Sequence, residues 1–175
     1  MDNKKYSFVF MGVSGSGKTT VAEAIAQKLN VPFVDGDFLH PRSNINKMSA
    51  GIPLDDADRE PWLEAVNSAI YAMQHTHKVS LIACSALKRK YRDALRKDNK
   101  GVCFIYLKGE YNLIVKRLQE RKNHFFKPQM LQSQFDVLEE PLNTHHDIFT
   151  VSIDESPESI IKKIISFIEK ASSTD

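Results

Sequence analysis

Residues 12 to 19 read Gly12-Val13-Ser14-Gly15-Ser16-Gly17-Lys18-Thr19. This segment matches the phosphate-binding loop pattern G-x-x-x-x-G-K-[ST] at each fixed position. Its three glycines allow the backbone to turn tightly, so that its N–H groups converge on phosphate oxygens. Lys18 adds a positive charge within the loop, and the Thr19 hydroxyl can ligate Mg²⁺. The segment therefore predicts a triphosphate-binding site formed by residues 12–19.

The sequence on either side of the loop has the order strand, loop, helix that this motif requires. Before the loop, the apolar run Phe8–Met11 is too short for a helix and indicates a strand. After it, Val21, Ile25 and Leu29 recur every four residues, which predicts a helix that begins at Lys18. The positive N-terminal end of that helix would point at the anion. A Gly-rich turn without a ligand is the weaker interpretation.

Length and charge favour one α/β domain with no general affinity for nucleic acid or membrane. A chain of 175 residues buries about 70% of its unfolded surface on folding, so residues 1–175 are expected to form a single domain. With 24 basic and 22 acidic side chains, the net charge of +2 gives no overall field to attract a polyanion.

Neither a signal peptide nor a membrane span is expected from the sequence. Its N-terminus has no apolar signal-peptide core, and no apolar run reaches the length of a membrane span. Cys84 and Cys103 lie within apolar runs, which indicates buried thiols rather than a disulfide. These features together predict a cytoplasmic protein.

Strand-like and helix-like segments alternate along the chain, which is typical of a parallel sheet with crossover helices. Apolar runs predict further strands at 31–34, 79–84, 102–107 and 149–153. Helices are expected at 41–51, from a cap at Asp58 to His75, at 88–97, 111–122 and 130–138, and from Pro157 onward. The last helix carries an apolar stripe expected in the core, formed by Ile160, Ile161, Ile164, Ile165 and Ile168.

Two carboxylates follow the second predicted strand, at Asp35 and Asp37. Phosphate-loop proteins place a carboxylate at the end of another core strand to orient Mg²⁺, and the third strand ends in Cys84-Ser85 without one. Residues two apart in an extended segment point to the same side, here the edge where α/β folds bind ligands. We assign Asp35 to the metal and Asp37 to proton acceptance, and the reverse assignment stays open. A simple turn around Gly36 is the alternative.

A lid is predicted after the fourth strand. Arg117 and Arg121 are four residues apart on one helix and share a face. A guanidinium stabilises the charge that develops on a transferred phosphoryl group. A kinase must also exclude water, and residues 122–132 are expected to form a mobile flap that does so. We assign Arg117 to the nucleotide and Arg121 to catalysis, with a solvated basic helix face as the alternative.

A second basic helix offers an alternative function. Lys88, Arg92 and Arg96 share one face, as in some nucleic-acid-binding helices. The small net charge and the lack of paired stacking aromatic residues nearby argue against that function. Lys88, nearest the end of the third strand, is the residue expected to meet an anionic substrate. The six histidines show no metal-ligand spacing, and His40, directly after the acidic pair, is either a substrate contact or a plain loop residue.

Further motifs extend over roughly residues 8 to 141. They are Asp35-Gly36-Asp37, Leu39-His40-Pro41, Asn44, Lys47-Met48, Gly51, Pro53-Leu54, Asp58-Arg59, Pro61-Trp62-Leu63, Cys84-Ser85-Ala86-Leu87-Lys88, Tyr91-Arg92-Asp93, Arg117-Leu118, Arg121, His124-Phe125, Ser133-Gln134-Phe135, Leu138-Glu139 and Pro141. Together these motifs resemble those of the gluconokinases. The stretch from Asp35 to Leu63 is the most specific, because it separates this family from shikimate and adenylate kinases. Thr19, where Ser is commoner, and His145-His146, in a loop expected to be more acidic, depart from the family pattern.

The resemblance implies an ATP:D-gluconate 6-phosphotransferase that yields 6-phospho-D-gluconate and ADP for the pentose phosphate or Entner–Doudoroff route. It also implies Mg²⁺ as cofactor, a homodimer, and a three-layer phosphate-loop kinase fold whose five-stranded parallel sheet has the order 2-3-1-4-5, with a helical lid. An open-chain sugar acid needs a cation for its carboxylate and polar groups for its hydroxyls. The residues expected to supply them are Asp37, His40, Asn44, Lys47, Arg59, Lys88 and His124.

Two rival functions use the same loop. A nucleoside monophosphate kinase would differ only in its acceptor, which a comparison of acceptors separates. A guanine-nucleotide switch would need the base-reading motif N-K-x-D, and the nearest segment, Asn46–Ser49, lacks the aspartate.

Overall fold

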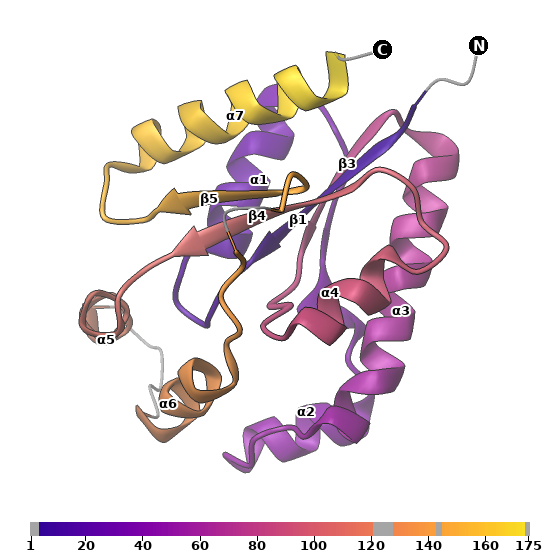
Figure 1. Ribbon diagram of the computed structural model, residues 1–175. Coiled ribbons are helices and arrows are strands. Elements are labelled where there is room, and N and C mark those ends of the chain that lie inside the picture. The colour runs from indigo at the N-terminus through magenta and orange to yellow at the C-terminus, as the bar shows by residue number, and fades with distance from the viewer. Residues whose placement is uncertain (1–3, 121–127, 143–144, 174–175) are drawn as a thin grey trace.

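The computed structural model describes residues 4–120, 128–142 and 145–173 (Figure 1). At its centre is a five-stranded parallel sheet in the order β2-β3-β1-β4-β5, as predicted from the resemblance. The strands are β1 (Tyr6–Met11), β2 (Phe33–Asp35), β3 (Val79–Ala83), β4 (Val102–Lys108) and β5 (Ile148–Ser152). Their bounds agree with the predicted ones to within two residues.

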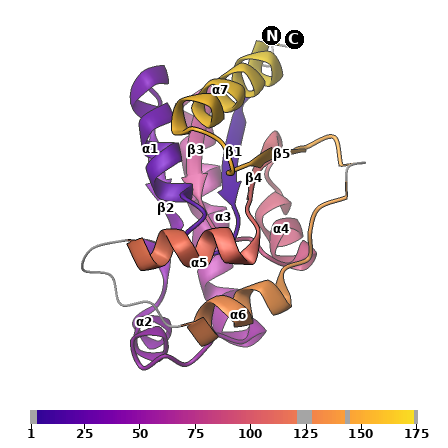
Figure 2. The same ribbon diagram turned by 90° about the vertical axis from the view of Figure 1, so that its left-hand side faces the viewer.

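Helices cover both faces of the sheet and extend beyond its carboxyl edge. They are α1 (Lys18–Leu29), the short 3₁₀ helix η1 (Gly36–Leu39), α2 (Arg42–Ser49), α3 (Asp56–Thr76), α4 (Arg89–Arg96), α5 (Tyr111–Glu120), α6 (Pro128–Val137) and α7 (Pro157–Ser173). In Figure 1, α1 and α7 lie on one face, and α3 and α4 on the other. Figure 2 shows α2, α5 and α6 together at the end toward which the strands run.

The central strand β1 shows why the sheet needs cover on both faces. All six of its residues are buried, as in strands of a parallel sheet packed between helices. Because successive side chains alternate, Phe8 and Phe10 pack with α1 and α7, whereas Val9 and Met11 pack with α3 and α4. The stripe on α7 contributes Ile160, Ile164 and Ile168 to the first of these two cores, which confirms its predicted structural role.

Helix α3 begins earlier than expected. The predicted cap at Asp58 is wrong, because the Asp55 side chain accepts the backbone N–H of Asp58 (2.8 Å) and caps the helix. In turn, the Asp58 side chain accepts the backbone N–H of Asp55 (3.0 Å). This reciprocal capping box uses both carboxylates, and it places Pro61 beyond the first turn.

The basic helix α4 does not present the cationic face suggested by its sequence. The Arg92 side chain is only 3% exposed and donates to the carbonyls of Ala86 (2.9 Å) and Leu87 (3.0 Å). Arg96 pairs with Asp93 and with Asp147. Lys88 pairs with Asp56 (3.0 Å). All three predicted surface cations are therefore engaged in contacts within the protein, which weakens the nucleic-acid alternative.

Two other expectations concern the whole chain. Cys84 is buried, Cys103 is half-buried, and both are free thiols, as predicted. Within the ranges that the structure covers, no helix combines the length and apolarity needed to cross a membrane. Of the predicted lid 122–132, residues 128–132 form the start of α6, and residues 122–127 lie outside the described residues.

Candidate active site

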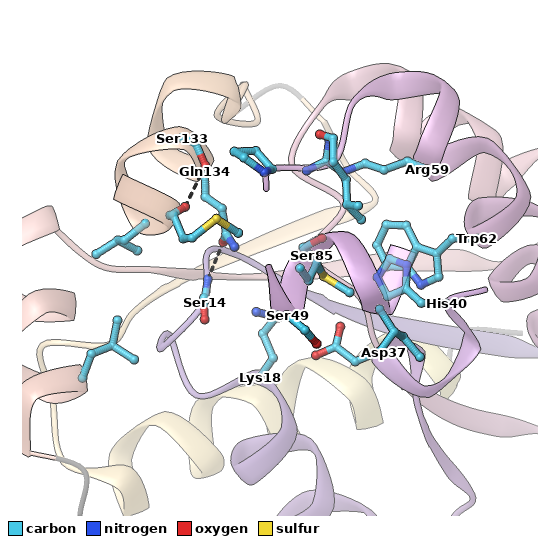
Figure 3. A pocket seen from close by; sticks show the side chains of 17 residues that line it. Ser14, Lys18, Asp37, His40, Ser49, Arg59, Trp62, Ser85, Ser133 and Gln134 are labelled. Carbon is cyan, nitrogen blue, oxygen red and sulfur yellow. Dashed lines mark hydrogen bonds between the residues drawn. The ribbon is translucent and has the colours of Figure 1, made fainter. Parts of the chain in front are cut away.

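A cavity of about 610 Å³ lies at the carboxyl end of the sheet (Figure 3). It is bounded by the phosphate-binding loop, η1, α2, the start of α3, α5 and α6. The lining residues with polar side-chain groups are Ser14, Lys18, Asp37, His40, Ser49, Arg59, Trp62, Ser85, Ser133 and Gln134. The cavity therefore brings the phosphate-binding loop next to several residues predicted to bind the acceptor.

The loop has the backbone geometry of an anion cradle. Gly15 has a φ of +80°, and a Cβ there would lie 2.8 Å from Cγ of Leu118, so only glycine fits. Lys18 Nζ donates to the Val13 carbonyl (3.0 Å), which keeps the charge within the loop. The hydroxyl of Ser16 is buried and has no hydrogen-bond partner among the described residues. A buried donor of this kind fits a phosphate oxygen.

The residues predicted for the metal lie in direct contact. Thr19 Oγ1 donates to Asp35 Oδ2 (2.8 Å), and Asp35 Oδ1 accepts the backbone N–H of Asp37 (3.0 Å). No cluster of three His, Cys, Asp or Glu side chains suitable for a metal occurs within the described ranges. A hydroxyl beside a carboxylate nevertheless fits Mg²⁺, which takes few protein ligands and completes its shell with water and phosphate oxygens.

Asp37 is the carboxylate that faces the cavity. Figure 3 shows its side chain beside Lys18 and below His40. Burial raises the pKa of Asp37; the positive charge of Lys18 opposes this effect and the negative charge of Asp35 adds to it. A raised pKa makes a carboxylate a stronger base, so Asp37 is suited to accept a proton.

His40 is held flat against Trp62. The two rings stack with centroids 4.3 Å apart and planes 13° apart, and Trp62 Nε1 donates to the Gly36 carbonyl (2.8 Å). Burial, together with the charge of Arg59, lowers the pKa of His40 to about 4. The imidazole is therefore neutral at physiological pH and serves as a hydrogen-bonding group.

Arg59 presents a cation to the same cavity. Its Nη1 donates to the Leu54 carbonyl and lies 3.5 Å from the Tyr91 hydroxyl, and its guanidinium stands over the Tyr91 ring at 5.6 Å. These contacts fix the side chain but leave its charge unneutralised, since no carboxylate among the described residues pairs with Arg59. An anionic ligand group would supply the missing partner.

Asn44 and Lys47, both predicted to bind substrate, do not line the cavity. Asn44 is 1% exposed, and its Nδ2 donates to the Asp58 carbonyl (2.7 Å) and lies 3.2 Å from His40 Nδ1. Lys47 Nζ lies 2.7 Å from both carboxylate oxygens of Asp58. Both side chains thus support the residues of α2 and α3 that do face the cavity.

Lys88 and Arg117 also have protein partners. Lys88 Nζ donates to Asp56 Oδ1 (3.0 Å), and Arg117 Nη2 donates to the carbonyl of Ile153. Neither lines the cavity. The remaining predicted residues, Arg121 and His124, lie outside the described residues.

Helix α6 contributes a contact for which the sequence suggested no role. The Ser14 backbone N–H donates to Gln134 Oε1 (2.7 Å), and Met130, Leu131 and Ser133 line the same wall of the cavity. The segment Ser133-Gln134 was visible only as part of the family resemblance. The available signal was a polar pair on an amphipathic helix, which does not by itself distinguish a cavity wall from a solvated face.

Comparisons with known proteins agree with this geometry. A family model described as shikimate kinase matches residues 14–169. The thermoresistant gluconokinase of Escherichia coli (strain K12) is 55% identical over 163 residues, covering 93% of each chain. The thermosensitive gluconokinase of the same strain is 48% identical, over 85% of this chain and 79% of its own. The crystal structure of a gluconokinase from Sinorhizobium meliloti 1021 superposes with a TM-score of 0.86 at 39% identity, over 95% of this chain and 93% of that one.

Proposed function

Because the chain belongs to the gluconokinase family, within the shikimate kinase-like phosphate-loop kinases, we propose that its cavity binds ATP at the loop 12–19 and D-gluconate between η1 and α3. The chain catalyses the ATP-dependent phosphorylation of gluconate to 6-phosphogluconate. One observation supports the assignment of an ATP end and a gluconate end to the cavity. Asp37 lies in the cavity with Lys18 on one side and His40 on the other.

Asp37 is proposed as the general base. As the 6-hydroxyl oxygen of gluconate forms its bond to the γ-phosphorus of ATP, the bond from that phosphorus to ADP breaks and Asp37 takes the hydroxyl proton. Lys18 and the N–H groups of the loop bind the phosphates of ATP, and the loop residues 12–19 position them. We further propose that Arg117 contacts the nucleotide and that Arg121 stabilises the transferring group.

Thr19 and Asp35 are proposed to hold Mg²⁺, on the strength of their 2.8 Å contact. The bound ion would neutralise phosphate charge during transfer. Asp35 is also the acceptor for the Asp37 backbone N–H (3.0 Å). Its carboxylate therefore orients the segment that carries the base.

Arg59 is proposed to bind the gluconate carboxylate, and His40 a hydroxyl of the substrate. The support for the first role is a cation that lines the cavity without a carboxylate partner among the described residues. Lys47, Lys88 and His124 remain further proposed contacts. Binding by the two lysines would require exchange of their aspartate partners for substrate oxygens.

We also propose that the chain is one kinase domain, cytoplasmic and homodimeric, with a lid at 122–132. The free thiols support a reducing compartment. Single exposed apolar side chains such as Phe38 and Tyr71 do not identify a subunit contact, so the homodimer rests on the family resemblance. Light scattering during gel filtration would test the dimer, and a mass equal to one chain would refute it.

Acceptor choice tests the assignment of the cavity. We expect ADP release to be fastest with gluconate, much slower with glucose, which lacks the carboxylate, and slow with shikimate or AMP. NMR of the product should place the phosphate on the 6-hydroxyl. Lys18→Met, folded but nearly inactive, provides the background rate. Faster turnover with AMP or shikimate would refute the proposed acceptor end and leave the phosphate-binding loop unaffected.

A further inference from the structure

The hydrogen bonds of Asn44 determine which nitrogen of His40 carries the proton. Asn44 Nδ2 lies 2.7 Å from the Asp58 carbonyl oxygen and 3.2 Å from His40 Nδ1. The opposite orientation of the amide would bring two acceptor oxygens, Oδ1 of Asn44 and the carbonyl of Asp58, into contact without a hydrogen between them. The carbonyl of Asp58 therefore fixes Asn44 Nδ2 in this position. One hydrogen of Nδ2 is donated to that carbonyl and the other to the imidazole of His40.

An imidazole nitrogen that accepts a hydrogen bond carries no proton. Since Asn44 Nδ2 only donates, His40 Nδ1 is the acceptor, and the single proton of the neutral ring resides on Nε2. A half-turn of the ring would leave it stacked on Trp62 but would put a carbon in place of Nδ1 beside Asn44, so the contact with Asn44 sets the orientation of the ring. Asn44 does not line the cavity whereas His40 does, so the Nδ1 edge faces protein and the ring offers its Nε2–H to the cavity.

The charges around His40 act in the same direction. Arg59 on α3 lines the cavity with it and disfavours a second proton on the ring. Asp37 on η1 faces Lys18, which balances its charge. Behind Asn44, the carboxylate of Asp58 is paired with Lys47. Burial and Arg59 are the influences on the pKa of His40, and no carboxylate among the described residues raises that pKa to hold an imidazolium.

We propose that Asn44 is a positioning residue, which fixes His40 as the neutral Nε2–H tautomer so that His40 acts only as a hydrogen-bond donor to an oxygen of the acceptor. The role of the donor rests on the proposed function, but the tautomer is a property of the free protein. Among the described residues that line the cavity, Asp37 is then the one group able to receive the substrate proton, because it is the only carboxylate there.

The direct test is long-range ¹H–¹⁵N NMR of the ¹⁵N-histidine-labelled full chain without ligand, with His40→Gln to assign the resonances. We expect a protonated Nε2 and an unprotonated Nδ1 at pH 7.5, with no titration down to about pH 5, since burial and Arg59 lower the pKa of His40 to about 4. A proton on Nδ1, or a ring that becomes charged near pH 6.5, would overturn the proposal.

A second test changes the hydrogen-bond polarity at residue 44. In Asn44→Asp the new carboxylate accepts from Nδ1–H, so the pKa of His40 should rise and kcat/KM for gluconate should show a new ionisation. We expect about a tenfold or greater loss of kcat/KM for gluconate, the scale of one mispaired buried hydrogen bond. An unchanged His40 titration in this variant would contradict the proposal; if the variant does not fold, the wild-type spectrum still decides.

Asn67 provides the matched control. Its Nδ2 also donates to backbone carbonyls, those of Ala94 (2.9 Å) and Lys97 (2.9 Å), and it ties α3 to α4 away from the cavity. Asn67→Asp should lower stability but leave the His40 titration and kcat/KM unchanged. If gluconate is a poor acceptor while His40 shows the expected tautomer, the proposed function fails and the positioning role of Asn44 stands. If gluconate is a good acceptor and His40 shows another tautomer, only the positioning role is rejected.

Discussion

The backbone N–H of Ser14 donates to Oε1 of Gln134 over 2.7 Å and joins residues that are 120 positions apart in the sequence. This bond places α6 against the phosphate-binding loop, on one wall of the cavity. Since the loop N–H groups are also those that bind phosphate, the position of α6 is linked to the state of the loop.

Gln134→Ala should therefore loosen this wall and admit water. We expect the ratio of gluconate phosphorylation to ATP hydrolysis to fall by about tenfold, the scale of a lost hydrogen bond. Parallel assays of ADP and 6-phosphogluconate measure the ratio. Gln132→Ala is the control, because Gln132 on the same helix bonds only to Asp136 among the contacts seen. An equal ratio in both variants would contradict the role of Gln134.

Asp37→Asn should lower kcat by about 10² to 10⁴, the usual loss on removal of a general base, with ATP binding retained by titration. Since burial raises the pKa of Asp37, wild-type activity should fall on the acid side at a pH above the ordinary range of a carboxyl group, as the base becomes protonated. In Asp37→Asn this acid limb should disappear. Asp35→Asn should instead raise the Mg²⁺ concentration needed; the opposite pattern would reverse the two assignments.

Arg59→Ala should narrow the preference for gluconate over glucose. A hydrogen bond to a charged group contributes about 1.5 to 3 kcal/mol, or about 10- to 100-fold in kcat/KM for gluconate, and glucose has no carboxylate to lose. The KM for ATP should stay unchanged. Arg89→Ala removes an exposed arginine and serves as the control. An unaltered ratio of the two acceptors would show that Arg59 does not bind the carboxylate.

Arg121→Lys should not restore the activity lost in Arg121→Ala. Lysine keeps the charge but lacks the planar fork of a guanidinium, and arginines that stabilise a transferred phosphoryl group are worth about 10³-fold or more in rate. Single-turnover measurement of phosphoryl transfer tests this. Wild-type rates in the lysine variant would assign Arg121 to a solvated helix face.

Arg92→Met should destabilise the fold more than Arg89→Met. Arg92 is buried and donates to the carbonyls of Ala86, Leu87 and Glu139, whereas the Arg89 side chain is 68% exposed. Leaving buried carbonyls without donors costs about 1–3 kcal/mol each. Urea unfolding should show a drop of that size or more for Arg92→Met, and similar curves for the two variants would contradict it.

The sequence was sufficient to predict most of the fold and the main chemistry of the site. Apolar runs and the phosphate-binding loop located all five strands, and the order of residues placed Asp35 and Asp37 at the carboxyl edge, although residues 36–39 form the 3₁₀ helix η1 and not the extended segment expected there. These features are local, so periodicity and spacing report them. The strand order came from the family resemblance, because local patterns do not specify which strands are neighbours.

The predictions that were wrong or missing concern contacts between residues far apart in the sequence. Asp58 looked like a helix cap, but three acidic residues compete there and Asp55 takes the role. Lys88 looked available for an anion, but the fold brings it to Asp56, 32 residues away. Likewise, no sequence pattern placed Gln134 beside the phosphate-binding loop. Such pairings depend on how helices dock, which side-chain type alone does not specify.

The hydrogen bond from Trp62 to the Gly36 carbonyl (2.8 Å) ties together the two ends of a 27-residue excursion of the chain. Gly36 also lies close against the end of β3, where a Cβ would stand 2.5 Å from the Ala83 carbonyl oxygen. The proposed acceptor contacts His40 and Arg59 both fall inside the closed excursion, while the loop that binds phosphate lies outside it. An evolutionary replacement of residues 36–62 as one segment would therefore change His40, Arg59 and the base Asp37 together, and leave the phosphate-binding loop 12–19 unchanged.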